Sequence, residues 1–383
     1  MLKKILLSVF LLIGFIGFVH GQSQILGQDT TRRPIITAVP FLTIAPDARA
    51  AGMGDAGGAL SADANATYWN AAKLAFIETN VGGSLSFTPW LAKLVDDMYV
   101  FYGSGYKKLS DTEAIGASLR YFDLGDITFT DSQGNVDSEG KPKEFSLDLS
   151  YSRILSKTST KGFGMGVTGR FIHSNLTSGL VSTTAKPGNT AAVDLGAFYE
   201  NKGLLVGGLA STLRMGAQIS NVGIKISYSD ANSKDFLPTN LRLSSALTTE
   251  IDGFNKFTVS LDVNKLMVPS PDENNQSPDK TLIPGMFGSF SDAPDGFSEE
   301  LQELVIAVGA EYWYNDIFAI RAGYFNEHEL KGARKYFTAG VGFKYTKFAF
   351  DFAYLIAAKQ NNPLENTLRF TLMVNVDSLK EGE

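Results

Sequence analysis

The sequence predicts an all-β protein: a transmembrane antiparallel β-barrel of about fourteen strands, with an N-terminal plug in its lumen. Three observations support this fold class. Many short segments alternate apolar and polar side chains, as strands with one lipid-facing and one lumen-facing side do. The connectors between these segments alternate between long and short. Beyond the N-terminal 21 residues, no apolar run reaches the roughly 18 residues of a membrane-spanning helix.

The first element, residues 1–21, reads as a secretory signal peptide. Lys3 and Lys4 precede an apolar run over 5–19, and Gly21 stands before the expected mature start at Gln22. This order of charged, apolar and small residues is typical of a cleaved signal. The chain contains no cysteine, which excludes both a disulfide framework and an acylated lipoprotein cysteine. We therefore expect export from the cytoplasm and anchoring by the fold itself.

The composition argues against several classes of function. A formal net charge of −6 gives no sign of the basic face that nucleic-acid binding usually needs. His173 and His328 lie far apart in the sequence, and neither is near a Gly-x-Ser-x-Gly turn, so we expect no enzymatic activity. Residues 326–329 offer one histidine and no spaced second ligand. No metal and no cofactor are expected.

The second element, residues 22–79, is rich in Gly and Ala. Small residues permit close packing of the backbone, which suits a segment folded inside a lumen. Residues 52–57, GMGDAG, formally match the dinucleotide-binding fingerprint. That fingerprint requires a buried strand before it and a helix after it, and neither is indicated here. We expect a plug and no nucleotide site.

The third element, residues 80–376, is the expected barrel, and residues 377–383 form a short periplasmic tail. Segment 223–229 is expected to extend the seventh strand beyond the membrane, and 201–210 to be a long Gly-rich connector. The expected strands are 80–88, 97–107, 113–122, 143–155, 161–173, 190–200, 211–220, 240–249, 256–266, 302–314, 317–326, 335–345, 347–356 and 366–376.

Long connectors follow the odd strands, as at 123–142, 174–189 and 267–301, whereas those after even strands are mostly tight. Outer-membrane barrels have short periplasmic turns and long extracellular loops. We therefore expect an integral outer-membrane protein in contact with lipid and lipopolysaccharide. Both termini should be periplasmic and the long loops extracellular.

Charged residues occur on the expected inward faces of the strands. Both signs are present, which favours salt-bridge networks within the lumen over an ion-selective ring. These residues are Arg120, Asp148, Arg170, Asp194, Arg214, Arg242, Asp262, Glu303, Glu311, Arg321, Asp351 and Arg369.

Two expected outer loops are candidates for partner binding. The first is short and apolar and contains Trp90, Leu91, Leu94 and Val95. Such side chains are costly at an exposed tip unless they meet a partner, although Trp90 and Leu91 dipping into the lipid interface is an alternative. The second, 267–301, contains five prolines among acidic residues, and we expect a solvated, partly mobile loop that orders on partner binding.

Residues 48–56, ARAAGMGDA, and 63–72, DANATYWNAA, resemble the N-terminal hatch of FadL-like outer-membrane barrels. The resemblance places Gly52 and Gly54 in the hatch motif, together with Asn70, Ala71 and Ala72. In that family the hatch ends in Asn-Pro-Ala. Here Asn70 and Ala72 match, and Ala71 stands where the family has proline.

A closer resemblance covers most of the mature chain. Residues 36–42 (ITAVPFL), 88–91 (TPWL), 94–98 (LVDDM), 119–122 (LRYF) and 125–129 (GDITF) are together similar to the PorV family of the type IX secretion system. The resemblance implies a FadL-like fourteen-stranded barrel that is not itself the protein-conducting pore. It also implies binding of the C-terminal signal domain of secreted cargo, docking on the translocon barrel (SprA, also called Sov) and delivery to the PorU attachment complex. The alternative is a FadL-type passive transporter of hydrophobic small molecules.

Overall fold

The computed structural model describes residues 32–376, apart from 180–184, 230–233, 274 and 359–363. The expected signal peptide and the C-terminal tail lie outside the described residues. Within the described part, strands dominate, and none of the helices is long and apolar enough to cross a membrane.

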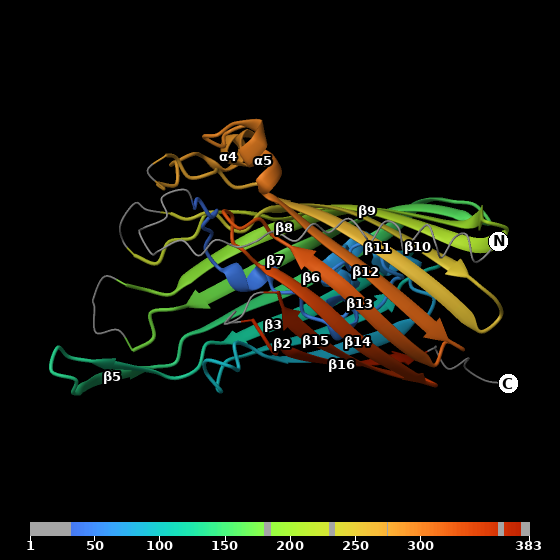
Figure 1. The fold of residues 1–383 in the computed structure, drawn as a ribbon, viewed down its shortest axis with the longest axis horizontal. Helices are drawn as coiled ribbons and strands as arrows, with labels where there is room; N and C mark the ends of the chain where they lie inside the picture. Colours follow the sequence, from blue (N-terminus) through green and yellow to red (C-terminus); the bar gives the residue numbers. More distant parts are fainter. Residues whose placement is uncertain (1–31, 180–184, 230–233, 274, 359–363, 377–383) are drawn as a thin grey trace. The chain divides into compact units, whose positions relative to one another are not determined.

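Fourteen strands close into one antiparallel barrel, in which each strand pairs with its neighbours in the chain and β16 returns to pair with β1 (Figure 1). The predicted fold class and strand number are confirmed. The barrel strands are β1 Val81–Pro89, β2 Tyr99–Lys108, β3 Glu113–Asp123, β6 Lys143–Lys157, β7 Lys161–Asn175, β8 Gly188–Val206, β9 Leu209–Gly223, β10 Asn240–Glu250, β11 Asn255–Leu266, β12 Leu304–Tyr314, β13 Phe318–Asn326, β14 Lys335–Tyr345, β15 Phe348–Ala357 and β16 Leu368–Val376.

The two faces of the wall differ in chemistry, as a period of two residues requires. In β6 the exposed positions include Leu147 and Leu149, whereas Ser146, Asp148 and Ser150 between and beside them are buried toward the lumen. An apolar outer face is suited to lipid. Closure of the sheet pairs the backbone groups between strands, and in hydrocarbon each group left unpaired costs several kcal/mol.

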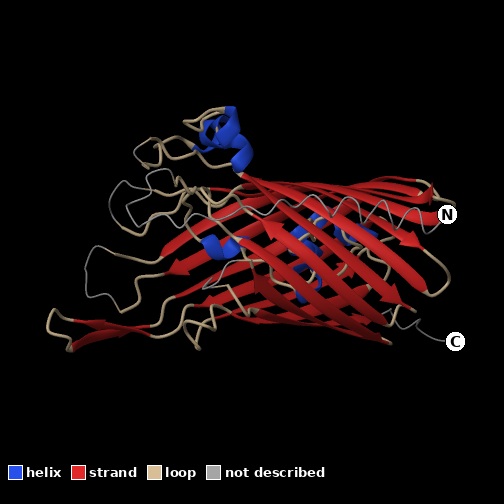
Figure 2. Ribbon diagram, viewed as in Figure 1, coloured by secondary structure: helices blue, strands red, loops and turns tan. Residues whose placement is uncertain are grey.

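The connectors sort into two ends of the barrel (Figure 2). The predicted alternation of long and short connectors is confirmed, and we call the two ends the long-loop end and the short-turn end. The long-loop end carries 90–98, 124–142, 176–187, 224–239, 267–303, 327–334 and 358–367, and the short-turn end carries 109–112, 158–160, 207–208, 251–254, 315–317 and 346–347.

Two details of the predicted connectors are wrong. Segment 201–210 is not a long loop, because β8 and β9 continue to a tight turn at Gly207 and Gly208. Both glycines have positive φ, 60° and 86°, as a two-residue hairpin of this hand requires. The seventh barrel strand ends at Gly223 and is not extended over 223–229, where Ile226 and Ser229 make only isolated bridges.

Two long loops carry structure that the sequence pattern did not reveal. The 124–142 loop contains a hairpin, β4 Ile127–Thr130 and β5 Val136–Gly140. The 267–303 loop contains two helices, α4 Leu282–Gly288 and α5 Phe297–Gln302. The prediction of a mobile loop at 267–301 therefore missed two short helices.

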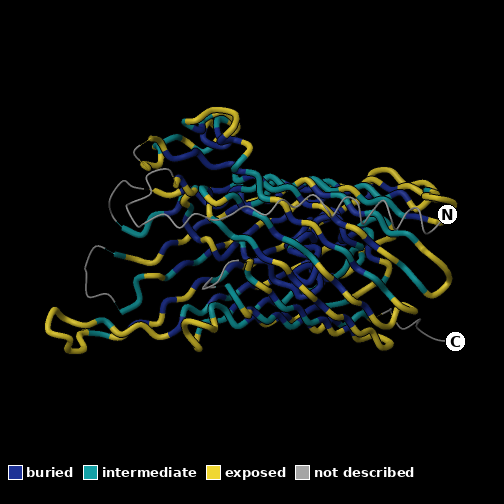
Figure 3. Tube along the Cα trace, viewed as in Figure 1, coloured by how far each residue is buried: buried dark blue, intermediate teal, exposed yellow. Residues whose placement is uncertain are grey.

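The described residues before β1 lie within the ring of strands (Figures 1 and 2). They form short helices, η1 Pro40–Thr43, α2 Ala48–Ala51, α3 Ala66–Trp69 and η2 Ala71–Phe76. Most of the segment is buried, and Val39, Met53 and Leu74 are fully so. Figure 3 shows this buried region at the centre of the barrel. We call residues 33–79 the luminal segment.

Candidate functional site

The contact between the luminal segment and the wall is the first candidate site, and wall glycines allow the two backbones to touch. A methyl group at Gly323 of β13 would lie 2.0 Å from the Gly54 nitrogen, and one at Gly309 of β12 would lie 2.4 Å from the Met53 oxygen. Opposite them, a methyl at Gly166 of β7 would lie 2.4 Å from the Ala72 nitrogen. Side chains at these wall positions would exclude the luminal segment.

A buried ionic chain links α2 to the wall. Arg49 donates two hydrogen bonds of 3.0 Å to the carboxylate of Glu311, which also accepts a 2.7 Å bond from Arg321. Arg321 in turn donates to Asp351 at 2.7 Å. Paired, hydrogen-bonded geometry of this kind offsets the cost of burying the charges. These linked ion pairs therefore fix α2 against β12, β13 and β15.

Two further contacts hold the luminal segment. Asp55 accepts hydrogen bonds from Arg369 at 2.7 Å and from the Tyr336 hydroxyl at 2.6 Å. Arg120 of β3 donates to the Leu42 carbonyl at 2.8 Å, and its guanidinium lies 4.4 Å from the ring centroid of Tyr68. Of the predicted inward charges, Arg120 thus binds backbone carbonyls and an aromatic face.

A second ionic group lies within the wall itself. Arg170 donates to Asp148 at 2.8 and 3.0 Å and to Asp194 at 3.0 Å. The β8–β9 register shifts at Asp194, and the Asn221 backbone N–H donates to that carboxylate at 2.7 Å. This group confirms the prediction that inward charges pair across the lumen wall.

The predicted hatch-motif residues take up structural positions in the luminal segment. Asn70 accepts a hydrogen bond from the Ala72 N–H, capping η2, and its amide donates to the Ala197 carbonyl at 2.9 Å. Ala71 is the first residue of η2. Proline is also favoured at that position of a helix, so the substitution leaves the turn intact.

The two motif glycines lie where the segment meets the wall. Gly54 has a φ of +70°, and a Cβ there would lie 2.5 Å from the Tyr324 nitrogen. Gly52 packs against Gly340 of β14, where an added Cβ would lie 3.1 Å from the glycine Cα. Both positions therefore favour glycine for close approach, and Gly54 also for its backbone conformation.

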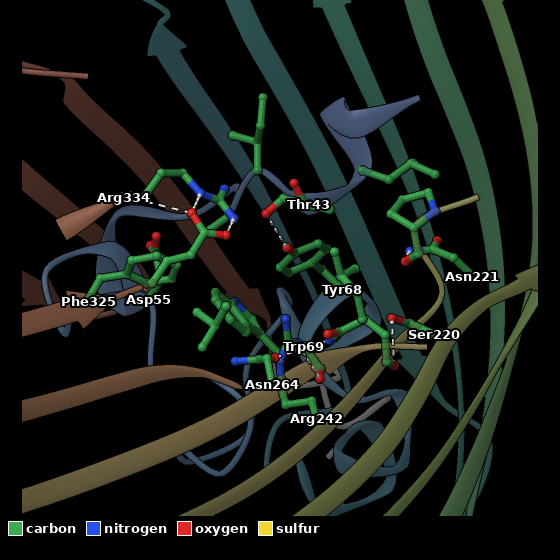
Figure 4. A pocket seen from close by; sticks show the side chains of 18 of the residues that line it. Thr43, Asp55, Tyr68, Trp69, Ser220, Asn221, Arg242, Asn264, Phe325 and Arg334 are labelled. Atoms are coloured by element: carbon green, nitrogen blue, oxygen red, sulfur yellow. Dashed lines mark hydrogen bonds and ion pairs between the residues drawn. The ribbon is translucent and has the colours of Figure 1, made fainter. Parts of the chain in front are cut away.

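A cavity of about 1200 Å³, including its open mouth, lies between the luminal segment and the loops of the long-loop end. Phe325 and Arg334 border one side and Ser220 and Asn221 the other, with Tyr68 between them (Figure 4). Its lining also includes apolar residues of the luminal segment, the strands and a long loop: Leu42, Ile44, Val305, Leu355 and Leu364.

The cations of this cavity are held by partners. Arg334 donates to both oxygens of Glu327, at 2.8 and 2.9 Å. Burial alone would lower the pKa of Arg334, but the pairing with Glu327 outweighs it and raises that pKa. Arg242 donates to Asn264 at 2.9 Å and stacks 4.7 Å from the Trp69 ring centroid. The cavity is thus an amphipathic recess with neutralised charges.

The structure separates the four residues of the predicted partner-binding loop. Trp90 is half-buried, lines the cavity and packs against a cluster that includes Phe41. Leu91 is partly covered and has a φ of +51°. Leu94 and Val95 are exposed at the tip. Trp90 therefore serves the packing of the loop, and Leu94 and Val95 are available to a partner.

Sequence reasoning missed the luminal partners of the wall charges, namely Arg49 and Asp55. Both lie in a segment without regular periodicity, so no face could be assigned to them. The signal that could have found them was charge: Arg49 and Asp55 are two of the four charged residues in the otherwise Gly- and Ala-rich stretch 46–66.

A closed fourteen-stranded barrel with an apolar exterior and an ion-paired lumen defines an integral outer-membrane β-barrel. A family model described as "Type IX secretion system protein PorV" matches residues 27–273. The chain belongs to this family, which makes it an outer-membrane barrel of type IX secretion. No curated protein matches it.

Solved structures with similar folds are FadL-like barrels. The toluene transporter TbuX of Ralstonia pickettii superimposes with a TM-score of 0.51 at 11% identity, covering 86% of this chain and 98% of its own. The toluene transporter TodX of Pseudomonas putida gives 0.50 at 13% identity, covering 85% and 96%. At such identities the likeness concerns the fold alone.

Proposed function

We propose that this barrel is a binding module, without enzymatic activity, of the type IX secretion system. It binds the C-terminal signal domain of secreted cargo, docks on the translocon barrel SprA (Sov) and delivers cargo to the PorU attachment complex. The observation that carries the proposal is the family match over residues 27–273. The luminal segment, tied to the wall through Arg49 and Glu311, supports binding over conduction.

The proposal includes an orientation. The long-loop end faces outward through a lipopolysaccharide-bearing leaflet, and both termini are periplasmic, as in other barrels with short periplasmic turns. Cargo and translocon then meet the cavity, the β4–β5 hairpin and the exposed Leu94 and Val95.

Passive transport of hydrophobic small molecules is the second candidate. The apolar side of the cavity favours it, and TbuX and TodX are described as toluene transporters. Against it, a hydrocarbon path should be lined by apolar side chains. The lumen below the cavity instead holds Arg49, Glu311 and Arg321.

Deletion of the gene separates the two candidates. The binding module predicts loss of surface-attached cargo with unaltered uptake of long-chain lipids and aromatic hydrocarbons. Reduced uptake with normal cargo display would select the transporter.

Point variants then test the loop tip. Leu94→Ser with Val95→Ser should reduce co-purification of the translocon or of the cargo signal domain. Leu109→Ser, an exposed leucine in a short turn at the opposite end, is the matched control. Unchanged recovery of both partners by the double variant would remove this loop tip from the binding surface.

A further inference from the structure

The helical excursion between β11 and β12 exposes apolar side chains that its own fold does not use. Figure 1 shows α4 and α5 at the long-loop end, outside the ring of strands. Phe287 of α4 is 63% exposed and Phe297 of α5 is 77% exposed. The α4–α5 apolar face consists of Ile283, Phe287, Phe290, Phe297 and Leu301, all of them exposed.

Spacing places these residues on common faces. Ile283 and Phe287 are four residues apart in α4, and Phe297 and Leu301 are four apart in α5, so each pair shares one side of its helix. Other sides of α4 face the protein, because Met286 is buried and Gly285, opposite Ile283 and Phe287, packs against Phe236. The exposed side is therefore not the remainder of a core.

A buried ionic cluster holds the excursion to the barrel. Lys265 of β11 donates to Glu300 at 2.9 Å, and Lys331 donates to Glu299 at 2.6 Å. Both lysines also reach Glu303, which accepts a 2.6 Å bond from Ser270. The apolar face is thus presented on a fixed support, and preorganisation of this kind lowers the cost of binding.

The charge around the face distinguishes among occupants. Residues 267–303 contain eight acidic residues and a single base, Lys280, and neither α4 nor α5 contains Lys or Arg. Three of those carboxylates are neutralised in the cluster, and Asp279 and Asp295 pair with Lys225 and Arg33. The side chains of Glu273, Asp279 and Asp295 remain exposed, so the surface of the excursion keeps an acidic excess. Helices that lie on anionic membranes are instead rich in Lys and Arg on the polar face.

We propose that the α4–α5 apolar face is a docking surface for a protein partner that offers an apolar groove edged by lysine and arginine. Exposed aromatic side chains at the centre provide affinity, and the acidic surroundings provide charge complementarity. The inference deepens the proposed function, on which it rests, by assigning one of its protein partners to this excursion. A lipopolysaccharide surface or a second, equally acidic copy is disfavoured by charge repulsion.

The test uses the full-length barrel in neutral-lipid nanodiscs, with purified translocon and purified cargo signal domain as separate probes. Phe287→Ser with Phe297→Ser should weaken binding of one probe at least tenfold. Ser291→Lys added to this double variant places a positive charge beside Phe290 and should weaken the same binding below that of the double variant. The matched control is Leu109→Ser with Ile251→Ser, exposed apolar residues of two turns at the short-turn end, which should bind as the parent does.

The outcomes separate the two proposals. If the parent barrel binds a probe and the Phe287/Phe297 variant binds it equally well, the docking surface is wrong and the proposed function stands. If the parent binds neither probe, both are wrong. Two other results would overturn the proposal. If the parent attaches to lipopolysaccharide vesicles and the Phe287/Phe297 variant does not, the face binds lipid. If the parent self-associates in light scattering and the variant does not, the face binds a second copy.

Discussion

At the scale of single residues, Glu311 joins the luminal segment to the barrel. Its carboxylate receives Arg49 from α2 and Arg321 from β13, and both contacts are buried. Removing one member of such a group leaves buried charges with fewer hydrogen bonds than they need. The loss is larger than the net contribution of the pair, since the desolvation cost then has no compensation.

Arg49→Ala should therefore destabilise the barrel strongly. We expect a loss of about 3–5 kcal/mol in the free energy of unfolding, as measured for broken buried ion pairs. Urea unfolding in lipid vesicles, followed by tryptophan fluorescence, measures it. Lys256→Ala removes an exposed pair with Asp316 and should cost about 1 kcal/mol or less. Equal losses for the two variants would contradict the role given to Arg49.

The inward charges of the wall could be predicted from sequence, because alternation along a strand assigns each residue to a face. Asp148, Arg170 and Asp194 pair as that alternation implies. The charged residues of the luminal segment, Arg49 and Asp55, could not be predicted in this way, because short helices joined by turns have no common period. Trp90 is expected at an exposed loop tip, but the loop turns at Leu91, which has a positive φ, and Trp90 packs inward.

At the scale of elements, inward glycines set the distance between strand and luminal segment. β7 provides a matched pair on one strand. A methyl at Gly166 would lie 2.4 Å from the Ala72 nitrogen, whereas one at Gly169, on the outer face, would meet no atom within 4 Å. The first contact is with backbone, so the luminal segment itself would have to move.

Gly166→Ala should accordingly loosen η2 while leaving the barrel closed. We expect faster hydrogen exchange for the backbone amides of residues 66–76 in Gly166→Ala than in the parent. Gly169→Ala should exchange as the parent does, which also controls for the change in strand propensity. Identical protection of 66–76 in both variants would show that the wall accommodates the methyl group without moving the segment.

The ionic cluster under α5 should make that helix sensitive to acid. Burial alone would raise the pKa of Glu299, but hydrogen bonds from Lys331 and the Asp295 backbone, with the charge of Arg33, lower it. A lowered pKa stabilises the folded form at pH values above the ordinary 4.5 of a glutamate. That stabilisation is lost as the pH falls from 4.5 through the lowered pKa.

We expect α4 and α5 to become mobile as the pH falls through this window. A fluorophore on Ser291→Cys should then lose anisotropy, whereas one on Ser132→Cys in the turn between β4 and β5 should not. Adding Glu299→Gln should flatten the pH dependence of the Ser291 probe. Persistence of the full dependence in that variant would place the titrating group elsewhere.

Alternation with a period of two residues predicts which segments are strands, although β8 extends six residues beyond its expected end; elements without such a period are not predicted. β14 was expected at 335–345 and is found there, because side chains meeting lipid on one face and the lumen on the other enforce alternation. The sequence predicts a long loop where the structure has a tight turn at Gly207 and Gly208, since glycine composition does not distinguish the two. α4 and α5 are short, and their fixation depends on Lys265 and Lys331, which are distant in sequence from most of their partners.

At the scale of the whole molecule, the alternation of connectors fixes which loops share an end, and the remaining question is which end faces outward. The absence of cysteine from the sequence permits a direct measurement. Ser132, in the turn between β4 and β5, and Ser159, in the turn between β6 and β7, are both exposed and lie at opposite ends. Serine to cysteine is a conservative change at either position.

A membrane-impermeant maleimide applied to intact cells should label Ser132→Cys and leave Ser159→Cys unlabelled, because the proposed orientation puts the long loops outside and the short turns in the periplasm. Permeabilising the outer membrane should make both cysteines reactive, which controls for exposure in the folded barrel. Labelling of Ser159→Cys but not of Ser132→Cys in intact cells would show that the barrel has the opposite orientation. The α4–α5 apolar face, which lies at the same end as the β4–β5 hairpin, would then meet periplasmic partners in place of cargo and attachment machinery at the cell surface.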